Sequence, residues 1–440
     1  MNITLQKTAA APTPVIAAPP SKSDAHRLLI LAALSVSQEP IRILCSGTNA
    51  DMEATVGCLR ALGAGITASG HGYTVMPLDR TALSPTKEYA LYVGESGSTL
   101  RFLLPILGAL GVTAVIRRAG RLPDRPLSPL DAVLTAHGMT LYDDMHDRTV
   151  LHVHGKLHAG DYEIDGSVSS QFISGLLFAL PLLDAPSVLR ITGVISSAPY
   201  IALTHSALSR FGCTLLPEDK GHTYRIVPTP YRAAESLYVE GDWSGAAFLL
   251  CAGAMTDGVT VLGLNADSVQ GDRRILDVLA LAGCRIRWRD GAVTVCPPTD
   301  GLLRPIRIHA DDIPDLVPPI AMLCCAAHGA SVISGCGRLR IKESDRLTAI
   351  LNTVTALGGN ADSIGTADSD DTLTVHGTGK LRGGICDGVG DHRMVMSAAL
   401  AALISDGSVT VSDREAISKS YPRFFDDFTA FGIRDTDSSR

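Results

Sequence analysis

The most regular feature of the chain is a series of long apolar stretches, each opened by a short polar or acidic turn. Residues 172–183 and 394–404, for example, are hydrophobic on nearly every side of a helix, which is typical of helices buried in a domain core. After each stretch comes a β-branched run such as 259–262 or 409–411, which predicts a strand. The pattern therefore predicts a mixed α/β fold in which buried helices alternate with short strands.

A second series, of glycines, runs in step with the first. In six places a Gly closes an apolar helical stretch, where a helix C-cap favours a left-handed backbone. Successive members of the series are 71 to 75 residues apart: Gly63, Gly138, Gly212, Gly283, Gly358 and Gly432. Six units of about 74 residues account for the chain. Because this period is much longer than that of a solenoid repeat, two domains of three units each fit the length best.

Composition narrows the classes of protein that this pattern can represent. Of the 440 residues 46% are hydrophobic and 19% charged, and the net charge is −7. These values exclude a disordered chain and disfavour a binder of nucleic acids or membrane surfaces, which would need a basic face. No apolar stretch approaches the roughly 18 residues of a membrane-spanning helix, and the first residues lack the features of a signal peptide. The ten cysteines form no C-x-x-C pair, so we expect reduced thiols in a soluble, cytoplasmic protein.

The polar turns at the helix starts carry the candidate chemistry, because unpaired N–H groups and the helix dipole make such ends suitable for binding anions. Lys22, Ser23 and Arg27 lie on the first turn, and Gly97 lies in a loop of small residues that a phosphate can approach closely. Neither Gly-Lys pair of the chain is followed by Ser or Thr, which disfavours a P-loop NTPase. The third turn carries Ser169, Ser170 and Gln171.

Each of these groups also has a purely structural interpretation. Ser169 and Asp315 could merely cap the helices that they precede. Arg125, in the rigid loop 121–127, could be a solvated basic residue. The mixed-charge run 338–346 could be a surface ion-pair face, which contributes little to stability. Considered one at a time, these motifs leave the choice between structure and function open.

Taken together, the motifs resemble those of one enzyme family. Along the chain stand, in order, Ser21-Lys22-Ser23 with Arg27, the Gly97 loop, Asp124-Arg125-Pro126, Asp165-Gly166-Ser167-Val168-Ser169-Ser170-Gln171, Ile313-Pro314-Asp315, Lys342-Glu343-Ser344-Asp345-Arg346 and Asp391-His392-Arg393-Met394. The series closely resembles the 5-enolpyruvylshikimate-3-phosphate (EPSP) synthases over essentially the whole chain. The resemblance implies an α/β fold of two domains, the inside-out α/β barrel of the enolpyruvyl transferases, with three repeats in each domain. It implies that residues 1–20 and 241–440 form one domain, that residues 21–240 form the other, and that the active site lies in the cleft between them.

The resemblance also implies a reaction and the residues that perform it. The enolpyruvyl group of phosphoenolpyruvate would pass to the 5-hydroxyl of shikimate 3-phosphate with release of phosphate, and no metal or organic cofactor would take part. Asp315 would accept the hydroxyl proton, Glu343 would protonate the methylene carbon, and Lys342 and Lys22 would be the other catalytic residues. The residues implied to bind shikimate 3-phosphate are Lys22, Ser23, Arg27, Ser169, Ser170, Gln171, Ser197, Tyr200, Asp315 and Lys342. Those implied to bind phosphoenolpyruvate are Lys22, Gly97, Arg125, Gln171, Arg346, Arg393 and Lys419. A monomer without nucleic-acid or membrane partners is implied.

Four positions depart from the family pattern. Ala198 stands where many members carry Lys, Arg338 and Glu95 each replace an Asn, and Phe102 replaces a Pro. These changes leave the expected reaction unaltered, and they predict nothing about the response to the herbicide glyphosate.

Three other functions are compatible with the repeat. An enolpyruvyl transferase that acts on UDP-N-acetylglucosamine would share the fold, but it usually has a Cys in a mobile loop, and residues 111–126 contain none. An RNA 3′-terminal phosphate cyclase would need RNA-binding surfaces, which the net charge of −7 and the 5% aromatic content disfavour. A non-catalytic anion-binding protein would give no reason for Asp315 and Glu343 to stand among clustered cations.

Overall fold

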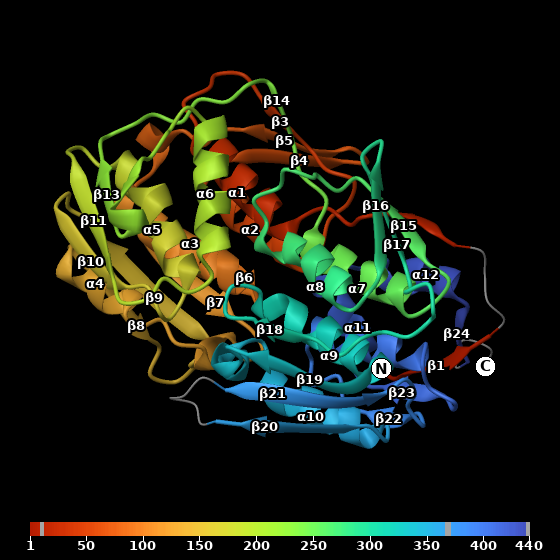
Figure 1. Ribbon diagram of the computed structural model, residues 1–440. Helices are drawn as coiled ribbons and strands as arrows, with labels where there is room; N and C mark the ends of the chain where they lie inside the picture. Colours follow the sequence, from red (N-terminus) through yellow and green to blue (C-terminus); the bar gives the residue numbers. More distant parts are fainter. Residues whose placement is uncertain (9–12, 366–370, 437–440) are drawn as a thin grey trace. The chain divides into compact units, whose positions relative to one another are not determined.

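The computed structural model describes residues 1–8, 13–365 and 371–436. Contacts divide the chain into two units: an N-terminal unit, Lys22–Val239, and a C-terminal unit, Met1–Ser21 with Glu240–Arg440. The described residues contain six four-stranded sheets, three in each unit (Figure 1). The mixed α/β fold of repeated units that the sequence predicts is thus confirmed.

All six sheets follow one plan. A first strand pairs in parallel with a second, the second pairs antiparallel with a third, and the third pairs antiparallel with a fourth. In the sheet β6-β7-β9-β8, for example, Leu91 pairs with Ile116, which pairs with Leu151. Since parallel strands need a long crossover, a buried helix connects the first and second strands in this sheet, as the sequence pattern predicts.

In the N-terminal unit the strands are β3 (Ile41–Leu44), β4 (Gly65–Ser69), β5 (Gly72–Met76), β6 (Glu88–Gly94), β7 (Thr113–Arg118), β8 (Met139–Asp143), β9 (Val150–Gly155), β10 (Asp161–Asp165), β11 (Ser187–Thr192), β12 (Pro217–Glu218), β13 (Thr223–Ile226) and β14 (Ser236–Tyr238). The α-helices are α1 (Lys22–Ala33), α2 (Ala50–Ala61), α3 (Gly97–Leu110), α4 (Leu130–Ala136), α5 (Ser170–Ala179) and α6 (Ala198–Arg210).

In the C-terminal unit the strands are β1 (Ile3–Lys7), β2 (Val15–Ala17), β15 (Val259–Leu262), β16 (Arg285–Arg289), β17 (Ala292–Cys296), β18 (Arg307–His309), β19 (His328–Ser334), β20 (Asn360–Ile364), β21 (Thr372–Thr378), β22 (Gly384–Cys386), β23 (Val409–Val411) and β24 (Ile433–Asp435). The α-helices are α7 (Trp243–Ala254), α8 (Ile275–Leu281), α9 (Val317–Ala326), α10 (Arg346–Ala356), α11 (His392–Ala402) and α12 (Phe424–Phe428). The strands predicted at 259–262 and 409–411 are confirmed with the same bounds.

Strands from distant parts of the chain complete three of the sheets. β1 lies between β23 and β24, with Ile3 opposite Val411, so that red and blue strands lie side by side in Figure 1. β2 pairs in parallel with β15, and β14 pairs in parallel with β3. The first residues of the chain therefore belong to the C-terminal unit, and the N-terminal unit closes with its own last strand.

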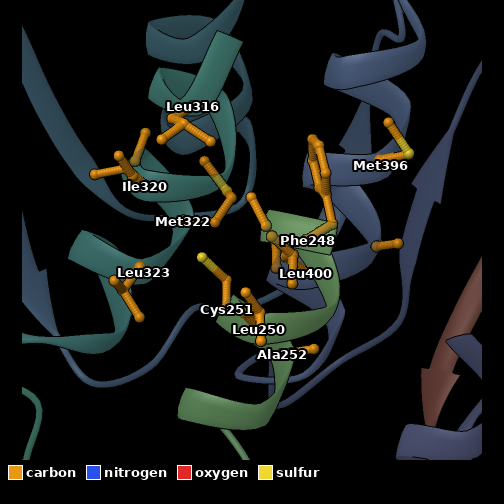
Figure 2. Close-up of a cluster of buried hydrophobic side chains, with 14 of the residues drawn as sticks. Phe248, Leu250, Cys251, Ala252, Leu316, Ile320, Met322, Leu323, Met396 and Leu400 are labelled. Atoms are coloured by element: carbon orange, nitrogen blue, oxygen red, sulfur yellow. The ribbon is translucent and has the colours of Figure 1, made fainter. Parts of the chain in front are cut away.

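The long apolar helices form the centre of each unit. Nearly every residue of α3 and α7 is buried, as expected for helices that are hydrophobic on all sides. In the C-terminal unit α7, α9 and α11 pack together, and Figure 2 shows Phe248, Met322 and Leu400 meeting between them. Each side chain of this size stabilises the fold by roughly 1.5–3 kcal/mol when fully buried. Within the described part of the chain, no helix combines the length and the apolar character needed to cross a membrane.

Two uses of glycine position the helices. The six glycines of the repeat all adopt positive φ, between 72° and 108°, which confirms the predicted left-handed residue after each helix. Gly175 in α5 has a different purpose: a Cβ there would lie 2.4 Å from the carbonyl oxygen of Arg101 in α3. The absence of a side chain lets α5 cross α3 closely, and so brings the polar starts of the two helices together.

Candidate active site

In the N-terminal unit, neighbouring helices hold the first turn of α1. The Lys22 ammonium lies 2.9 Å from the carboxylate of Asp51, at the start of α2. The buried Arg27 guanidinium donates to the carbonyl oxygens of Ser23 (2.6 Å) and Tyr200 (2.9 Å), and so ties α1 to α6. Burial lowers the pKa of Arg27 to about 10, which leaves it charged at neutral pH. The structure thus places two cations and one hydroxyl side chain of the predicted site within the first six residues of α1.

A buried chain of hydrogen bonds also joins helices α1, α2 and α3. His26 Nδ1 lies 2.6 Å from Thr55 Oγ1 in α2, and Thr55 Oγ1 lies 2.7 Å from Thr99 Oγ1 in α3. Thr99 in turn donates to Ser96, the N-cap of α3. Burial lowers the pKa of His26 to about 3, so the imidazole is neutral. The sequence motifs singled out neither His26 nor Thr55, whereas Ser96 and Thr99 flank Gly97 in the loop of small residues.

Gln171 connects the starts of α5 and α3. Its Oε1 accepts a hydrogen bond from Arg101 (2.8 Å), and its Nε2 donates to Ser98 (3.0 Å). Ser169 is the N-cap of α5 and accepts from the Gln171 backbone N–H, and Ser170 is the buried first residue of the helix. The capping interpretation of Ser169 is therefore correct. Gln171 performs a further task, because it fixes one helix start against another.

Two guanidinium groups lie against Gly97, the first residue of α3. A Cβ at this position would lie 2.9 Å from Nη1 of Arg125 and 3.0 Å from Nη1 of Arg101. The Arg125 guanidinium therefore lies at the start of α3, and the interpretation of this residue as part of a solvated basic loop is wrong. Two cations beside the N-terminus of a helix favour the binding of an anion there.

Three of the positions that depart from the family pattern also lie in this unit. Ala198 is the first helical residue of α6, directly after the buried Ser197, whose backbone is left-handed with φ of 55°. The ring centroid of Phe102 lies 5.0 Å from the Arg27 guanidinium, a cation–π contact. Glu95 is exposed and directly follows β6. The aromatic ring thus takes part in fixing a residue that belongs to the predicted site.

In the C-terminal unit, Arg346 binds three carboxylates at once. Its Nε donates to Asp391 (2.8 Å), its Nη1 to Asp315 (2.7 Å) and its Nη2 to Glu343 (2.7 Å). Only 1% of the arginine side chain is exposed. Although burial lowers its pKa, the three carboxylates hold the pKa well above the ordinary value. The interpretation of residues 338–346 as a solvated ion-pair face is therefore wrong at Arg346.

Asp315 lies among three cations. Besides Arg346, Arg393 binds it twice, through Nη2 to the carboxylate and through Nη1 to the backbone carbonyl, both at 3.2 Å. Although burial raises its pKa, the charges of Arg393, Lys342 and Arg346 hold it well below the usual range. Among the residues that the structure describes, no side chain caps the N-terminus of α9 with a hydrogen bond. The carboxylate thus serves the cation cluster, and the interpretation of Asp315 as a helix cap is wrong.

Two lysines of the predicted site also lie in the C-terminal unit. Burial, opposed by the charge of Asp315 and assisted by those of Arg338 and Arg346, lowers the pKa of Lys342 to about 8. Lys419 is buried at the end of a 3₁₀ turn, Arg414–Lys419, that packs against α11. The C-terminal unit therefore brings together the predicted residues Asp315, Lys342, Glu343, Arg346 and Arg393, and Arg338 joins them through its charge.

Comparison with known proteins identifies relatives along the whole length of the chain. A family model described as EPSP synthase (3-phosphoshikimate 1-carboxyvinyltransferase) matches residues 9–428. The 3-phosphoshikimate 1-carboxyvinyltransferase of Methanococcoides burtonii is 37% identical over 422 residues, which are 95% of each chain. That of Brachyspira hyodysenteriae is 33% identical over 418 residues, or 94% of this chain and 95% of the relative.

Solved structures share the fold at lower sequence identity. The EPSP synthase from Acinetobacter baumannii superimposes with a TM-score of 0.76 at 22% identity, over 98% of this chain and 99% of that one. The enolpyruvyl transferase NikO from Streptomyces tendae gives a TM-score of 0.76 at 19% identity, over 99% of both chains. At sequence identities this low, the two structures show that the fold is shared and nothing more.

Proposed function

This chain belongs to the family of EPSP synthases, the 3-phosphoshikimate 1-carboxyvinyltransferases, and on that premise we propose which of its residues carry the reaction. The enzyme transfers the enolpyruvyl group of phosphoenolpyruvate to shikimate 3-phosphate, a step of the shikimate pathway to the aromatic amino acids. The observation that carries the assignment is the buried cluster in which Arg346, Arg393 and Lys342 surround Asp315.

Helix starts and cations hold the two anionic substrates. Charge-assisted hydrogen bonds to carboxylates and phosphates are roughly twice as strong as neutral ones, and the N-termini of α1, α3, α5 and α11 each carry at least one suitable donor. Phosphoenolpyruvate binds to Lys22, Gly97, Arg125, Gln171, Arg346, Arg393 and Lys419. Shikimate 3-phosphate binds to Lys22, Ser23, Arg27, Ser169, Ser170, Gln171, Ser197, Tyr200, Asp315 and Lys342.

Asp315 is the general base that accepts the 5-hydroxyl proton. Its cations hold its pKa well below the usual range, which makes it a weak base. Binding of phosphoenolpyruvate supplies new anions for Arg346 and Arg393, and each interaction that these arginines transfer to the substrate raises the pKa of Asp315. The substrate thereby activates its own base, and Lys342, with its pKa lowered to about 8, relays the proton.

Glu343 is the acid that protonates the methylene carbon of phosphoenolpyruvate. Its carboxylate now accepts from Arg346 Nη2 at 2.7 Å, and a turn of that arginine toward the substrate leaves Glu343 able to hold a proton. As the proton reaches the methylene carbon, the 5-hydroxyl oxygen of the acceptor bonds to the neighbouring carbon and gives up its own proton to Asp315. In the second step the new methyl group loses a proton, the carbon–oxygen bond to phosphate breaks, and the double bond returns.

We also assign the enzyme to the cytoplasm, as a monomer. No disulfide joins the ten cysteines, all of which lie in the described residues, in agreement with a reducing compartment.

The first mutational prediction concerns Gly97. In Gly97→Ala the new Cβ would lie 2.9 Å from Arg125 Nη1, so the guanidinium must move away from the start of α3. We expect the KM for phosphoenolpyruvate to rise about 10-fold or more, which is the value of one charge-assisted hydrogen bond. Gly57→Ala in α2 is the matched control, because a Cβ there meets nothing within 4 Å, and its KM is expected to stay unchanged. An unaltered KM in the Gly97 variant would contradict the placement of the phosphoenolpyruvate site at α3.

Phosphate release from phosphoenolpyruvate tests the function itself. The purified protein is incubated in EDTA-containing buffer with shikimate 3-phosphate or UDP-N-acetylglucosamine as acceptor. We expect release that requires shikimate 3-phosphate and is unaffected by EDTA. Release with the sugar nucleotide alone would identify the other enolpyruvyl transferase, and no release with either acceptor would refute the assigned reaction.

A further inference from the structure

A threonine in the middle of α2 is the meeting point of the buried hydrogen-bond chain in the N-terminal unit. The Thr55 side chain is fully buried. Its Oγ1 lies 2.6 Å from His26 Nδ1 in α1 and 2.7 Å from Thr99 Oγ1 in α3. One hydroxyl group therefore joins three helices at a place where water cannot replace it.

The hydrogen bonds of this chain all run in one direction. Thr99 Oγ1 donates to Ser96 Oγ at 2.7 Å. Because each hydroxyl has one proton to donate, Thr99 accepts from Thr55, and Thr55 accepts from His26 Nδ1. The chain thus assigns the proton of the neutral imidazole to Nδ1. Among the residues that the structure describes, none bonds to the buried Nε2 of His26, so Thr55 is the hydrogen-bond partner on which the ring depends.

Helix α2 connects two parts of the proposed phosphoenolpyruvate site. Asp51 stands four residues before Thr55, and so on the same face of the helix, and its carboxylate lies 2.9 Å from the Lys22 ammonium. At the other end of the chain is Ser96, the N-cap of α3, which directly precedes Gly97. Contacts from one face of α2 therefore hold both Lys22 and the loop that contains Gly97.

We infer that Thr55 is a positioning residue for phosphoenolpyruvate, which acts by holding the N-terminus of α3 against α1 and α2. The inference rests on the proposed binding of this substrate at Lys22 and Gly97. Without the hydroxyl, the start of α3 is less well fixed, because a buried polar group cannot exchange a lost partner for water. The first turn of α1 stays in place, because the Arg27 guanidinium still donates to two groups of α6.

Two substitutions at Thr55 separate its hydroxyl from its volume. Thr55→Val nearly keeps the shape of the side chain and removes the hydroxyl, whereas Thr55→Ser keeps the hydroxyl. In Thr55→Val we expect the KM for phosphoenolpyruvate to rise roughly three- to tenfold, the effect of one hydrogen bond, and the KM for shikimate 3-phosphate to stay unchanged. Thr55→Ser is expected to have the wild-type value of both. Thr353→Val is the matched control, because Thr353 is likewise buried but lies in α10 of the C-terminal unit, and neither KM should change.

Two substitutions at His26 test the same chain from its other end. The amide of His26→Asn takes the place of Nδ1 and can still donate to Thr55, whereas that of His26→Gln takes the place of Nε2 and leaves Thr55 without this donor. We expect His26→Asn to keep the wild-type KM for phosphoenolpyruvate and His26→Gln to raise it as Thr55→Val does. This pair keeps the inference testable if Thr55→Val does not fold.

The split between the two KM values distinguishes positioning from a purely structural role, which would lower the melting temperature without it. Equal KM values for phosphoenolpyruvate in Thr55→Val and Thr55→Ser, or a rise in both KM values of Thr55→Val alike, would overturn the inference. A wild type that makes no product from shikimate 3-phosphate would instead refute the proposed function. The increase in melting temperature with added phosphoenolpyruvate, which reports binding without turnover, would then decide the inference: a smaller increase in Thr55→Val than in the wild type supports it, and equal increases, or none in either protein, overturn it.

Discussion

Replacing Asp315 with asparagine is expected to lower kcat by about 10²–10⁴-fold, the range typical for the loss of a general base. The amide cannot take the 5-hydroxyl proton, although it retains the shape of the carboxylate. We expect the KM for phosphoenolpyruvate to stay the same or fall, because Arg346 and Arg393 lose a competing anion. The variant should still fold, since Arg346 keeps the carboxylates of Glu343 and Asp391. Steady-state kinetics and a melting curve check these expectations.

Asp312→Asn is the matched control for this experiment. It makes the same chemical change three residues earlier in the chain, on a half-buried aspartate that has no part in the proposed reaction. Its kcat is expected to match that of the wild type. If Asp315→Asn yielded little folded protein but normal kcat in the part that folds, the carboxylate would be a structural residue and another base would have to be sought.

Replacing Arg346 with methionine is expected to destabilise the protein by about 3–5 kcal/mol, the cost of removing one partner from a buried ion pair. Asp391 has a fully buried side chain and would lose the charge that compensates its own. Although burial raises the pKa of Asp391, Arg346 and His392 hold it below the ordinary value. The stability from this group is thus present at neutral pH and is lost as the pH falls. The difference between variant and wild type should therefore shrink toward acid pH in urea unfolding experiments.

Arg304→Met serves as the control for Arg346→Met. Arg304 binds Asp300 at 2.7 Å, but both side chains are about half exposed, and exposed pairs contribute little. We expect the urea midpoint of this variant to stay close to that of the wild type. Equal midpoints for the two variants would show that the Arg346 cluster does not stabilise the fold, and that its three carboxylates matter only for the substrates.

The repeat explains why the site is distributed over so many elements. Each of the six central helices begins in a polar turn, and five of these starts carry residues that the motifs identify: α1, α3, α5, α9 and α11. The sixth, α7, carries none of them. Helix N-termini favour anions, so repetition of one unit produces several anion-binding ends from a single local pattern.

Much of the fold was determined by the sequence itself. Apolar stretches that are hydrophobic on all sides must be buried, and a glycine after each of them allows the left-handed backbone that ends a helix. Both features depend on residues within one or two turns of each other, so the six helices and the strands at 259–262 and 409–411 could be predicted without an alignment. The motifs also identified the residues that cluster around Asp315.

The tertiary structure alone decided which charged groups of the site contact one another. Arg346 meets Asp315 and Asp391 across 31 and 45 residues of chain, and local periodicity carries no information about such distances. The same holds for His26, which no motif marked and whose pKa burial lowers. The sequence by itself determined which elements form and which residues stand at their ends. Packing between distant segments decides which of those residues lie close enough for their charges to interact, and which side chains are desolvated. The reason is that both desolvation and Coulomb energy are set by distance in space.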